Sequence, residues 1–306
     1  MKAMVIHEYG GPEVLRAEDL PVPVPADGEV LVRVRAVSVN PVDYKRRRSW
    51  AAQPLPVVLG WDVSGVVEAL GPDVADFRVG DEVFGMVRFP AEGRAYAEYV
   101  SAPVSDIARK PPELTHAQAA AMTLAALTAE QALEALALRA GQTILIHAAA
   151  GGVGHFAVQL AHTRGARVIA TASARNIDFV RGLGADEIVD YHARPFEEQV
   201  SGVDAVFDTV GGDTLPRSFG VLRPGGRLVA IAGQPDEALA RQHGVHAERI
   251  LVHPSRPQLE FLAAEAAAGR VVPHVSQTFP LDRVADAHRA LETGRTVGKI
   301  VLEPVP

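Results

Sequence analysis

The sequence predicts an α/β protein in which a doubly wound parallel sheet is inserted into a smaller domain built mostly of β-strands. Short strands separated by proline- and glycine-containing turns fill the first part of the chain, and strands alternate with helices from Thr143 to Ala268. The residues that follow return to the strand-rich pattern of the first part. We therefore expect one domain at residues 1–115, completed by 270–306, and a parallel-sheet domain at 116–269, because chain ends that lie close together permit such an insertion.

The first 115 residues carry the signature of half-exposed strands. The segment Glu29–Val37 alternates apolar and charged side chains, and further strands are expected at Val63–Leu70 and Asp81–Val87. Gly-Pro and Val-Gly-Asp turns separate them. Many short strands with such turns are typical of a small barrel.

A different pattern begins at Thr115, which we expect to cap an alanine-rich helix that continues to Leu138. Beyond it we expect strands at Thr143–Ala148, Arg167–Ala172, Glu187–Tyr191, Ala205–Val210, Arg227–Ala232 and Arg249–His253. The helices between them are expected at His155–His162, Ile177–Leu183, Leu215–Leu222 and Pro257–Ala268. The C-terminal part should add a strand at Val271–Phe279, an amphipathic helix at Leu281–Leu291 and a strand at Lys299–Leu302.

The composition excludes several classes of function. The chain has 306 residues, a formal net charge of −7 and no cysteine. An acidic chain is a poor match for nucleic acid, and a chain without cysteine forms neither disulfides nor thiolate metal sites. No apolar run reaches the 18 or so residues of a membrane span. These features suit a protein of the reducing cytoplasm.

The segment Thr143–Gly154 predicts a nucleotide-binding turn. A short apolar strand is followed at once by Ala148-x-x-Gly151-x-x-Gly154 and then by a helix, a variant of the usual G-x-G-x-x-G. Glycines let the backbone approach a pyrophosphate closely, and the helix N-terminus attracts its charge. The expected cofactor contacts are Ala150, Gly151, Gly152, Val153 and Gly154, although many purely structural strand-to-helix turns also contain glycine.

Six stretches spread along the chain match motifs of one known family: Asn40–Lys45, Leu59–Val67, Val79–Phe84, His147–Gly154, Phe207–Gly212 and Gly298–Leu302. Together they show that the sequence resembles the medium-chain dehydrogenase/reductases, in their zinc-independent, quinone oxidoreductase-like (zeta-crystallin-like) branch. The resemblance covers essentially the whole chain. It implies a GroES-like β-barrel catalytic domain joined to a Rossmann domain, with the active site in the cleft between them. It also implies NADPH-dependent reduction of quinones or α,β-unsaturated carbonyls.

The second strand of the expected Rossmann domain favours NADPH over NADH. Its end reads Ile169-Ala-Thr-Ala-Ser173, without the Asp or Glu that would hold the ribose hydroxyls of NAD. We expect Thr171, Ser173 and Arg175 to contact the cofactor. Arg175 would lie in the first turn of a helix, where a cation is disfavoured unless an anion such as the 2′-phosphate binds it, and the alternative is a solvated arginine. Tyr191 matches a family tyrosine beside the adenosine, or is an ordinary strand aromatic.

The residues expected at the metal positions disfavour a catalytic zinc. Zinc-dependent relatives use cysteine, histidine and cysteine where this chain has Asn40, Trp61 and about Leu124, none of which is a good zinc ligand. A quinone or an enone needs less polarisation than an isolated carbonyl, because conjugation spreads the incoming charge. We therefore expect no metal and a conjugated acceptor.

Three residues are candidates for catalysis. Asn40 can donate its amide to the nicotinamide carboxamide or to the substrate, or it is a turn residue before Pro41. Tyr44 can donate a proton or hydrogen bond to a developing enolate, or it is a core tyrosine. Trp61 can form a flat wall of the substrate site, or it fills the barrel core.

Further cofactor contacts follow from the resemblance or from their place at strand ends. Lys45 matches a lysine and Thr128 a threonine that contact the cofactor in the family. Ligands bind at the carboxyl ends of parallel strands, where Val210, Gly211, Ala232 and Gly233 are expected. Gly298 and Lys299 are expected to return from the C-terminal part towards the same site.

Two other functions stay open alongside quinone or enone reduction. Enoyl-reductase domains of polyketide synthesis look similar, so the substrate could be an enoyl thioester. Family members have also been recruited as non-catalytic NADPH-binding proteins. As the family default we expect a homodimer, built by an exposed apolar edge strand near Arg249–His253.

Overall fold

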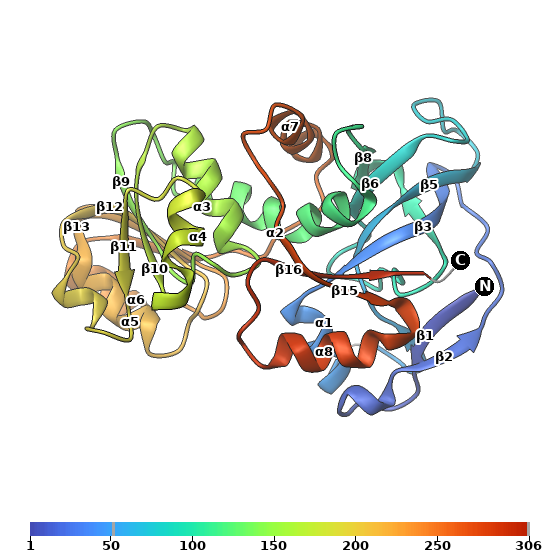
Figure 1. Cartoon of the computed structure of the whole chain (residues 1–306), viewed down its shortest axis with the longest axis horizontal. Coiled ribbons are helices and arrows are strands. Elements are labelled where there is room, and N and C mark those ends of the chain that lie inside the picture. The colour runs from blue at the N-terminus through green and yellow to red at the C-terminus, as the bar shows by residue number, and fades with distance from the viewer. Residues whose placement is uncertain (51–52, 305–306) are drawn as a thin grey trace. The chain divides into compact units, whose positions relative to one another are not determined.

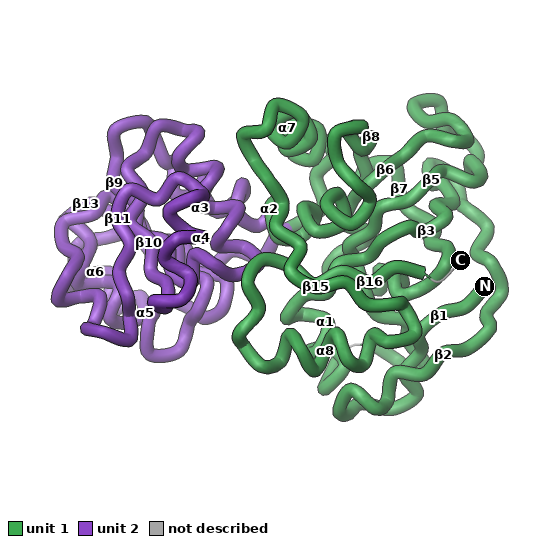
Figure 2. The backbone as a smooth tube through the Cα atoms, viewed as in Figure 1, with its two compact units in different colours: residues 1–127, 253–306 green, residues 128–252 purple. Residues whose placement is uncertain are grey.

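The computed structural model describes residues 1–50 and 53–304. Its chain divides into two compact units, the first formed by Met1–Leu127 with His253–Pro306 and the second by Thr128–Val252 (Figure 2). One segment of unit 1 therefore precedes unit 2 in the chain and the other follows it. The expected domain boundaries fall after residues 115 and 269. The observed division instead passes through helix α2 (His116–Ala135), after Leu127, and places helix α7 (Arg256–Ala267) in unit 1.

Unit 1 is built on β-strands. A seven-stranded sheet runs in the order β15-β16-β3-β5-β6-β8, with β7 also paired to β3, and a smaller sheet has the order β2-β1-β4. The strands are β1 (Lys2–Ile6), β2 (Arg16–Asp19), β3 (Glu29–Val39), β4 (Val57–Val58), β5 (Asp62–Leu70), β6 (Glu82–Met86), β7 (Tyr99–Pro103), β8 (Ile107–Arg109), β15 (Val275–Pro280) and β16 (Lys299–Glu303). The mostly β character expected for this part of the chain is confirmed.

Strand β3 is the centre of unit 1, since it pairs with β5, β7 and β16. Its apolar side chains Val30, Val32 and Val34 are buried, and the half-buried Arg33 and exposed Arg35 alternate with them. That alternation is what the sequence predicts for a strand with one buried face. The pairing of Val39 with Ile300 brings the C-terminal strand beside the end of β3.

Two helices of unit 1 position the residues discussed below. Helix α1 (Pro41–Arg48) begins directly after β3, with Pro41 in its first turn and Asn40 as its N-cap residue. Helix α8 (Val284–Glu292) precedes β16 in the chain and packs against it. Both lie close together in unit 1 (Figure 1).

Helix α2 spans the boundary of the two units, and α7 belongs to unit 1. Thr115 caps α2 as predicted, because the Gln118 backbone N–H donates to Thr115 Oγ1 at 3.2 Å. Helix α7 packs against β8, and Arg256 at its start pairs with Asp76 at 2.8 Å and lies over the Phe77 ring. These contacts tie α7 to unit 1.

Unit 2 is a six-stranded parallel sheet in the order β11-β10-β9-β12-β13-β14. The strands are β9 (Thr143–Ile146), β10 (Arg167–Ala172), β11 (Glu187–Asp190), β12 (Val203–Asp208), β13 (Leu222–Ala230) and β14 (His246–Arg249). Numbered within the sheet, this order is 3-2-1-4-5-6, the order of the Rossmann fold, which the sequence predicted. The chain reverses direction across the sheet between β9 and β12, where such folds bind their ligands.

A helix follows each of β9, β10, β12 and β13, as a parallel sheet requires (Figure 1). These are α3 (Gly154–Thr163), α4 (Ile177–Gly182), α5 (Thr214–Ser218) and α6 (Glu237–His243). Leu145, Val206 and Phe219 lie in the apolar core of this unit, in agreement with their strand and helix positions. Short 3-10 turns complete the chain at Pro12–Val14, Val104–Asp106, Ala174–Asn176, Phe196–Glu198, Phe219–Val221 and Leu281–Arg283.

The strand expected at Arg249–His253 was misplaced. The edge strand β14 covers His246–Arg249, because Gly244 ends α6 in a left-handed conformation and the chain then pairs with β13 from His246 onward. Its side chains at His246, Glu248 and Arg249 are exposed, so the strand is polar rather than apolar. Charged side chains are a common protection of exposed sheet edges.

Candidate functional site

The glycine turn of unit 2 has the geometry of a dinucleotide-binding loop. Ala148 takes a positive φ of 48°, in the place of the first glycine of the usual motif. The Gly151 N–H donates to the Ala148 carbonyl at 2.9 Å and closes the turn. A Cβ atom at Gly154 would lie 2.3 Å from the same carbonyl, so only glycine fits there. The third glycine of the motif is thus required by the close packing of the turn on α3.

The start of α3 presents unpaired backbone donors. Within residues 1–50 and 53–304, the N–H groups of Gly152, Val153 and Gly154 have no hydrogen-bond partner, and no side chain caps the helix. Ala150 lies within the same turn and is buried. Unpaired N–H groups at a helix N-terminus bind phosphate oxygens, and the helix dipole favours the negative charge. The residues of this turn therefore fit the pyrophosphate of a dinucleotide.

A buried, neutral network holds this turn in place. The Ala148 N–H donates to Thr171 Oγ1 at 3.1 Å, and that hydroxyl lies 3.3 Å from His147 Nδ1. On the other side of the ring, Nε2 lies 3.0 Å from Ser218 Oγ, which donates to the Thr214 carbonyl at 2.8 Å. The chain of donors is consistent only with a proton on Nε2 of His147. Burial lowers the pKa of His147 to about 3, so the ring stays neutral.

Ser173 and Arg175 lie directly after β10, in a 3-10 turn that leads into α4. Arg175 is exposed and has no partner among the described residues, whereas Asp178 pairs with Arg181 at 2.7 Å. Tyr191 follows the neighbouring strand β11 and is 48% exposed. Because Ala172 pairs with Asp190 in the sheet, Arg175 and Tyr191 follow strand ends at the same edge.

The ends of β12 and β13 meet on the other side of β9. Asp208 Oδ1 accepts hydrogen bonds from the N–H groups of Val210 and Gly211 at 2.7 and 2.8 Å. A Cβ atom at Gly211 would lie 3.0 Å from the carbonyl of Ala232, so the two loops touch there. Val210 is 48% exposed, Ala232 is exposed and Gly233 is half-buried. The structure thus brings these four predicted residues together at the carboxyl edge of the sheet.

Unit 1 contains a second group of predicted residues, organised as a buried cluster of charges. Asn40, Asp43, Asp62 and Lys299 are all buried. Asn40 Nδ2 donates to Asp62 Oδ2 at 2.8 Å, and its Oδ1 accepts from Lys299 Nζ. The Asn40 backbone N–H donates to Asp43 Oδ2 at 2.5 Å and completes a capping box. Much of the hydrogen-bonding capacity of Asn40 is therefore used inside unit 1.

Burial perturbs the acids and bases of this cluster. It raises the pKa of Asp43 to about 8, and the nearby Asp62 carboxylate adds to the effect, while the Asn40 N–H and the Lys299 ammonium oppose it. Burial also lowers the pKa of Lys299, against the opposing pull of Asp62 and Asp43. Such perturbed groups gather at functional sites.

A buried arginine extends the cluster towards α8. Arg47 donates to His288 Nδ1 at 2.9 Å and pairs with Glu292 at 2.6 Å. Because Arg47 is always charged and only donates, His288 accepts through Nδ1 and carries its proton on Nε2, 3.1 Å from the Tyr96 hydroxyl. Burial, with the Arg47 charge, lowers the pKa of His288 to about 3. These contacts fix α1 against α8.

The remaining predicted residues occupy varied positions. Tyr44 is half-buried on α1, where the Arg48 guanidinium lies over its ring, and Lys45 is exposed. Trp61 is fully buried, its Nε1 donates to the Ala91 carbonyl at 2.6 Å, and it packs against Trp50 and Phe89, which favours its role in the core. Thr128 is buried on α2.

Gly298 carries a structural requirement of its own. It has a φ of 62°, and a Cβ atom there would lie 2.2 Å from the His274 carbonyl. A glycine at this position is therefore needed for packing within unit 1, directly before Lys299.

Sequence reasoning missed several members of both clusters. Asp43, Asp62, Tyr96 and His288 in unit 1, and the buried role of His147 in unit 2, were not predicted. One available signal was an acid next to an apolar run, since Asp62 stands directly after Trp61 and before Val63. A buried carboxylate in such a place requires a partner.

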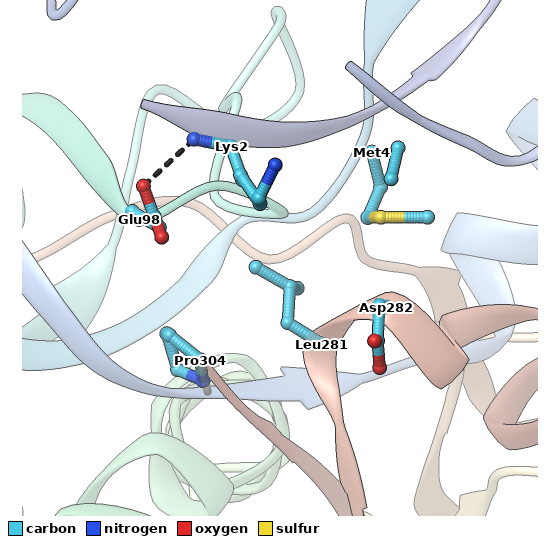
Figure 3. A pocket seen from close by; sticks show the side chains of 7 residues that line it. Lys2, Met4, Glu98, Leu281, Asp282 and Pro304 are labelled. Carbon is cyan, nitrogen blue, oxygen red and sulfur yellow. Dashed lines mark hydrogen bonds between the residues drawn. The ribbon is translucent and has the colours of Figure 1, made fainter. Parts of the chain in front are cut away.

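Unit 1 also contains a surface hollow that is lined by none of the residues of the two clusters. A hollow of about 350 Å³ in unit 1 is lined by Lys2, Met4, Ala17, Glu98, Leu281, Asp282 and Pro304 (Figure 3). The Lys2 side chain pairs with Asp19 at 3.5 Å, and both side chains are exposed. Nothing in this hollow resembles the buried groups of the two clusters. In the described part of the chain, no group of three or more His, Cys, Asp or Glu could hold a metal ion, and no helix is long and apolar enough to cross a membrane.

Comparisons with known proteins identify the family of this chain. A model of the alcohol dehydrogenase GroES-like domain matches residues 26–112, and a model of a zinc-binding dehydrogenase domain matches residues 183–302. The NADPH-dependent alkenal/one oxidoreductase of Arabidopsis thaliana chloroplasts is 38% identical over 100% of this chain and 80% of its own length. The chain belongs to the medium-chain dehydrogenase/reductases, in their quinone oxidoreductase-like branch.

Solved structures of this family superpose on the whole chain. A quinone oxidoreductase of Coxiella burnetii has 37% identity and a TM-score of 0.95, and covers 100% of this chain and 99% of its own. The quinone oxidoreductase of Escherichia coli, solved with NADPH, has 29% identity and a TM-score of 0.92, and covers 99% and 100%. These likenesses confirm the predicted GroES-like and Rossmann folds.

From the sequence we expect Asn40, Trp61 and about Leu124 at the positions of the catalytic zinc ligands. The side chains of Asn40 and Trp61 are engaged in hydrogen bonds within unit 1. An amide, an indole and an alkyl group are poor zinc ligands.

Proposed function

We propose that this protein is an NADPH-dependent reductase that transfers a hydride to a quinone or to the β-carbon of an α,β-unsaturated carbonyl. The observation that carries the proposal is the set of unpaired N–H groups at the start of α3, in a chain whose relatives of similar length are quinone and alkenal/one oxidoreductases. The bound NADPH would supply the hydride. The protein supplies binding, orientation and electrostatics.

The residues of unit 2 suit NADPH. The N–H groups of Gly152, Val153 and Gly154 would hold the pyrophosphate, with Gly151 in the same turn. Arg175, exposed and without an anionic partner among the described residues, would hold the 2′-phosphate beside Ser173, and Tyr191 would lie against the adenosine. Val210, Gly211, Ala232 and Gly233, at the ends of β12 and β13, would border the nicotinamide half of the cofactor.

The residues of unit 1 suit an acceptor that needs little polarisation. Asn40, Trp61 and Leu124 supply no metal ligand, so hydrogen bonds must stabilise the developing charge. A conjugated acceptor spreads that charge over several atoms. We assign the proton or hydrogen bond to Tyr44, which is half-buried on α1. Trp61 is left a supporting role in the core, because its ring is fully buried.

The test is NADPH oxidation by the purified protein with an ortho-quinone, an enone and an enoyl thioester. We expect steady turnover with the first two, and deuterium from 4-deuterated NADPH should appear at the β-carbon of the reduced enone. Turnover with the thioester alone would assign the protein to enoyl-thioester reduction. Tight NADPH binding without turnover on any acceptor would make it a binding protein and refute the proposal.

We also propose that the protein is cytoplasmic and a homodimer. The cytoplasmic assignment rests on the absence of cysteine, which suits a reducing compartment. The dimer rests on the family default, and β14 is the edge strand of the sheet through which a second copy would pair, although its side chains are polar and not apolar as expected. Cell fractionation checks the first, and sedimentation that gives a monomer at micromolar concentration would contradict the second.

A further inference from the structure

The three residues expected at the metal-ligand positions, Asn40, Trp61 and about Leu124, lie beside one buried carboxylate, that of Asp62. Asp62 Oδ2 accepts a hydrogen bond from Asn40 Nδ2 at 2.8 Å, and Oδ1 accepts one from the Leu124 backbone N–H at 2.9 Å. Asp62 also follows Trp61 directly in β5. It therefore links all three positions, although it was not predicted as a site residue.

The cation at this place is Lys299. Its Nζ lies 4.0 Å from Asp62 Oδ2, donates to the Val39 carbonyl at 3.1 Å and donates to Asn40 Oδ1. The side chains of Lys299 and Asp62 are 4% and 0% exposed. A buried ammonium needs several such partners, because its removal from water is costly. Two of its N–H groups donate hydrogen bonds to groups of unit 1, and the Asp62 carboxylate is its ion-pair partner, so the buried ammonium is directed at unit 1.

These partners allow only one orientation of the Asn40 amide. With the amide reversed, its NH2 group would face the Lys299 ammonium and its oxygen would face the Asp62 carboxylate. Both contacts would be repulsive, so the network itself assigns Oδ1 to Lys299 and Nδ2 to Asp62. Asn40 is also the N-cap of α1, the helix that carries Tyr44.

We propose that Lys299 and Asp62 are positioning residues: together they fix the amide of Asn40 and the start of α1 for hydride transfer, at the place where zinc-dependent relatives hold a metal. Lys299 acts through Asn40 and not by contact with NADPH. This inference rests on the proposed reductase function. It assigns to Lys299 a role that differs from the cofactor contact expected from the sequence.

Unit 1 offers a matched control for the loss of a buried ammonium. Lys110 Nζ donates to the carbonyls of Pro111 and Leu114 at 3.1 and 2.6 Å and pairs with Glu82 at 3.0 Å. Its side chain is 4% exposed, as is that of Lys299. None of its partners is a candidate site residue. Lys110→Met therefore removes a comparably buried charge without disturbing Asn40.

The first experiment compares Lys299→Met with Lys110→Met in single-turnover reduction of an ortho-quinone or an enone by bound NADPH. We expect Lys299→Met to slow hydride transfer about ten- to a hundredfold, as a small misplacement of an orienting group does. Its dissociation constant for NADPH should stay within about threefold of the wild-type value, since Lys299 does not contact the cofactor. Lys110→Met should lower the melting temperature to a similar degree and keep the rate of hydride transfer.

Two outcomes of this comparison would overturn the proposal. If Lys299→Met loses stability but keeps its hydride-transfer rate, as Lys110→Met should, the residue is merely structural. If it keeps the rate but binds NADPH much more weakly, it is a direct cofactor contact. Asp62→Asn combined with Lys299→Met restores charge balance, so the double variant should regain stability but not rate.

A second readout does not depend on turnover. In wild-type protein and in Lys110→Met, the two side-chain N–H signals of Asn40 should be separate and slowly exchanging in nitrogen-15 correlated NMR spectra. In Lys299→Met they should exchange faster and move towards the positions of a free amide. Unchanged Asn40 signals in Lys299→Met would refute the positioning role even if the wild-type protein reduced no acceptor, and that absence of turnover would separately refute the proposed function.

Discussion

The buried clusters of unit 1 and unit 2 each hold a chain segment in place, one through charged side chains and the other through neutral hydrogen bonds. Around Asn40 the partners are ionised or ionisable, namely Asp43, Asp62 and Lys299. Around His147 they are neutral hydroxyls and backbone groups, supplied by Thr171, Ser218 and Thr214. Each cluster fixes a segment that precedes a helix of the candidate site, α1 in one case and α3 in the other.

The difference matches what each segment must do. The turn before α3 has to present bare N–H groups to an anion, and a neutral support adds no charge that would compete with it. The N-cap of α1 has to hold one amide orientation, which a cation and an anion on opposite sides enforce better than neutral groups do. Charges therefore determine orientation in unit 1, and directional hydrogen bonds determine backbone shape in unit 2.

The largest effect should come from breaking the charged cluster. Asp62→Ala leaves the Lys299 ammonium buried without its carboxylate and removes the acceptor of the Leu124 N–H. Removal of one partner of a buried ion pair costs about 3–5 kcal/mol. Urea unfolding followed by circular dichroism should show a loss of that size. A loss below about 1 kcal/mol would show that the charges of this cluster are not interdependent.

An exposed charge of unit 2 should act on binding and not on folding. Arg175 has no partner among the described residues, and an arginine–phosphate pair contributes roughly 1.5–3 kcal/mol. Arg175→Ala should raise the Michaelis constant for NADPH by about ten- to a hundredfold, at roughly 1.4 kcal/mol per tenfold, and leave that for NADH nearly unchanged. Equal efficiency of the wild type with both cofactors would contradict this reading of the end of β10.

The two buried histidines should make the protein sensitive to acid. Their pKa values are lowered to about 3 by burial, whereas an unfolded histidine titrates near 6.5. The unfolded chain therefore binds more protons between these values, so stability is complete above pH 6.5 and is lost as the pH falls towards 3. At pH 5, each buried ring should lower the free energy of unfolding by about 2 kcal/mol relative to its value above pH 6.5. His147→Gln and His288→Gln should each make the unfolding free energy less dependent on pH between pH 5 and 7, as measured by denaturant titration. An unchanged pH dependence in both variants would show that the rings are not buried in the neutral form.

The smallest effect should come from the neutral cluster. Ser218→Ala removes the acceptor of His147 Nε2–H without exposing a charge. A single neutral hydrogen bond contributes about 1 kcal/mol, and thermal unfolding should show a loss near that value. NADPH binding should weaken only slightly, because Thr171 still supports Ala148. A loss as large as that of Asp62→Ala would remove the distinction between the two clusters.

The features that the sequence predicted correctly are those set by neighbouring residues, such as strands and turns. Strand β10 was predicted at its observed bounds, and the turn at Ala148–Gly154 was predicted because glycine spacing and hydrophobic runs are written in neighbouring residues. The edge strand β14 was misplaced by a few residues, because its exposed, polar side chains carry no apolar signal. Family likeness supplied the GroES-like assignment of the β-rich domain and candidates such as Lys45 and Thr128, which no local pattern singles out.

What the sequence could not show was the set of partners of each residue. Asn40 was predicted as a donor to ligand, but its contacts with Lys299 and Asp62 join residues 259 and 22 positions away. Trp61 was left between a substrate wall and a core residue, and only the burial of its ring favours the core. Long-range pairing of buried polar groups has no local periodicity from which it could be read.

The separation of 259 residues between Asn40 and Lys299 also affects the order in which the two units fold during synthesis on the ribosome. All of unit 2 is synthesised between the two residues, and its sheet uses only strands from its own segment. Unit 2 can therefore fold as soon as it emerges, since domains generally fold as units during synthesis. Until β16 is synthesised and pairs with β3, the Asp62 carboxylate lacks its cation and the Asn40 oxygen lacks its donor. The order of synthesis thus makes unit 1 the later of the two units to complete its fold. Its final strand carries the Lys299 ammonium that pairs with Asp62.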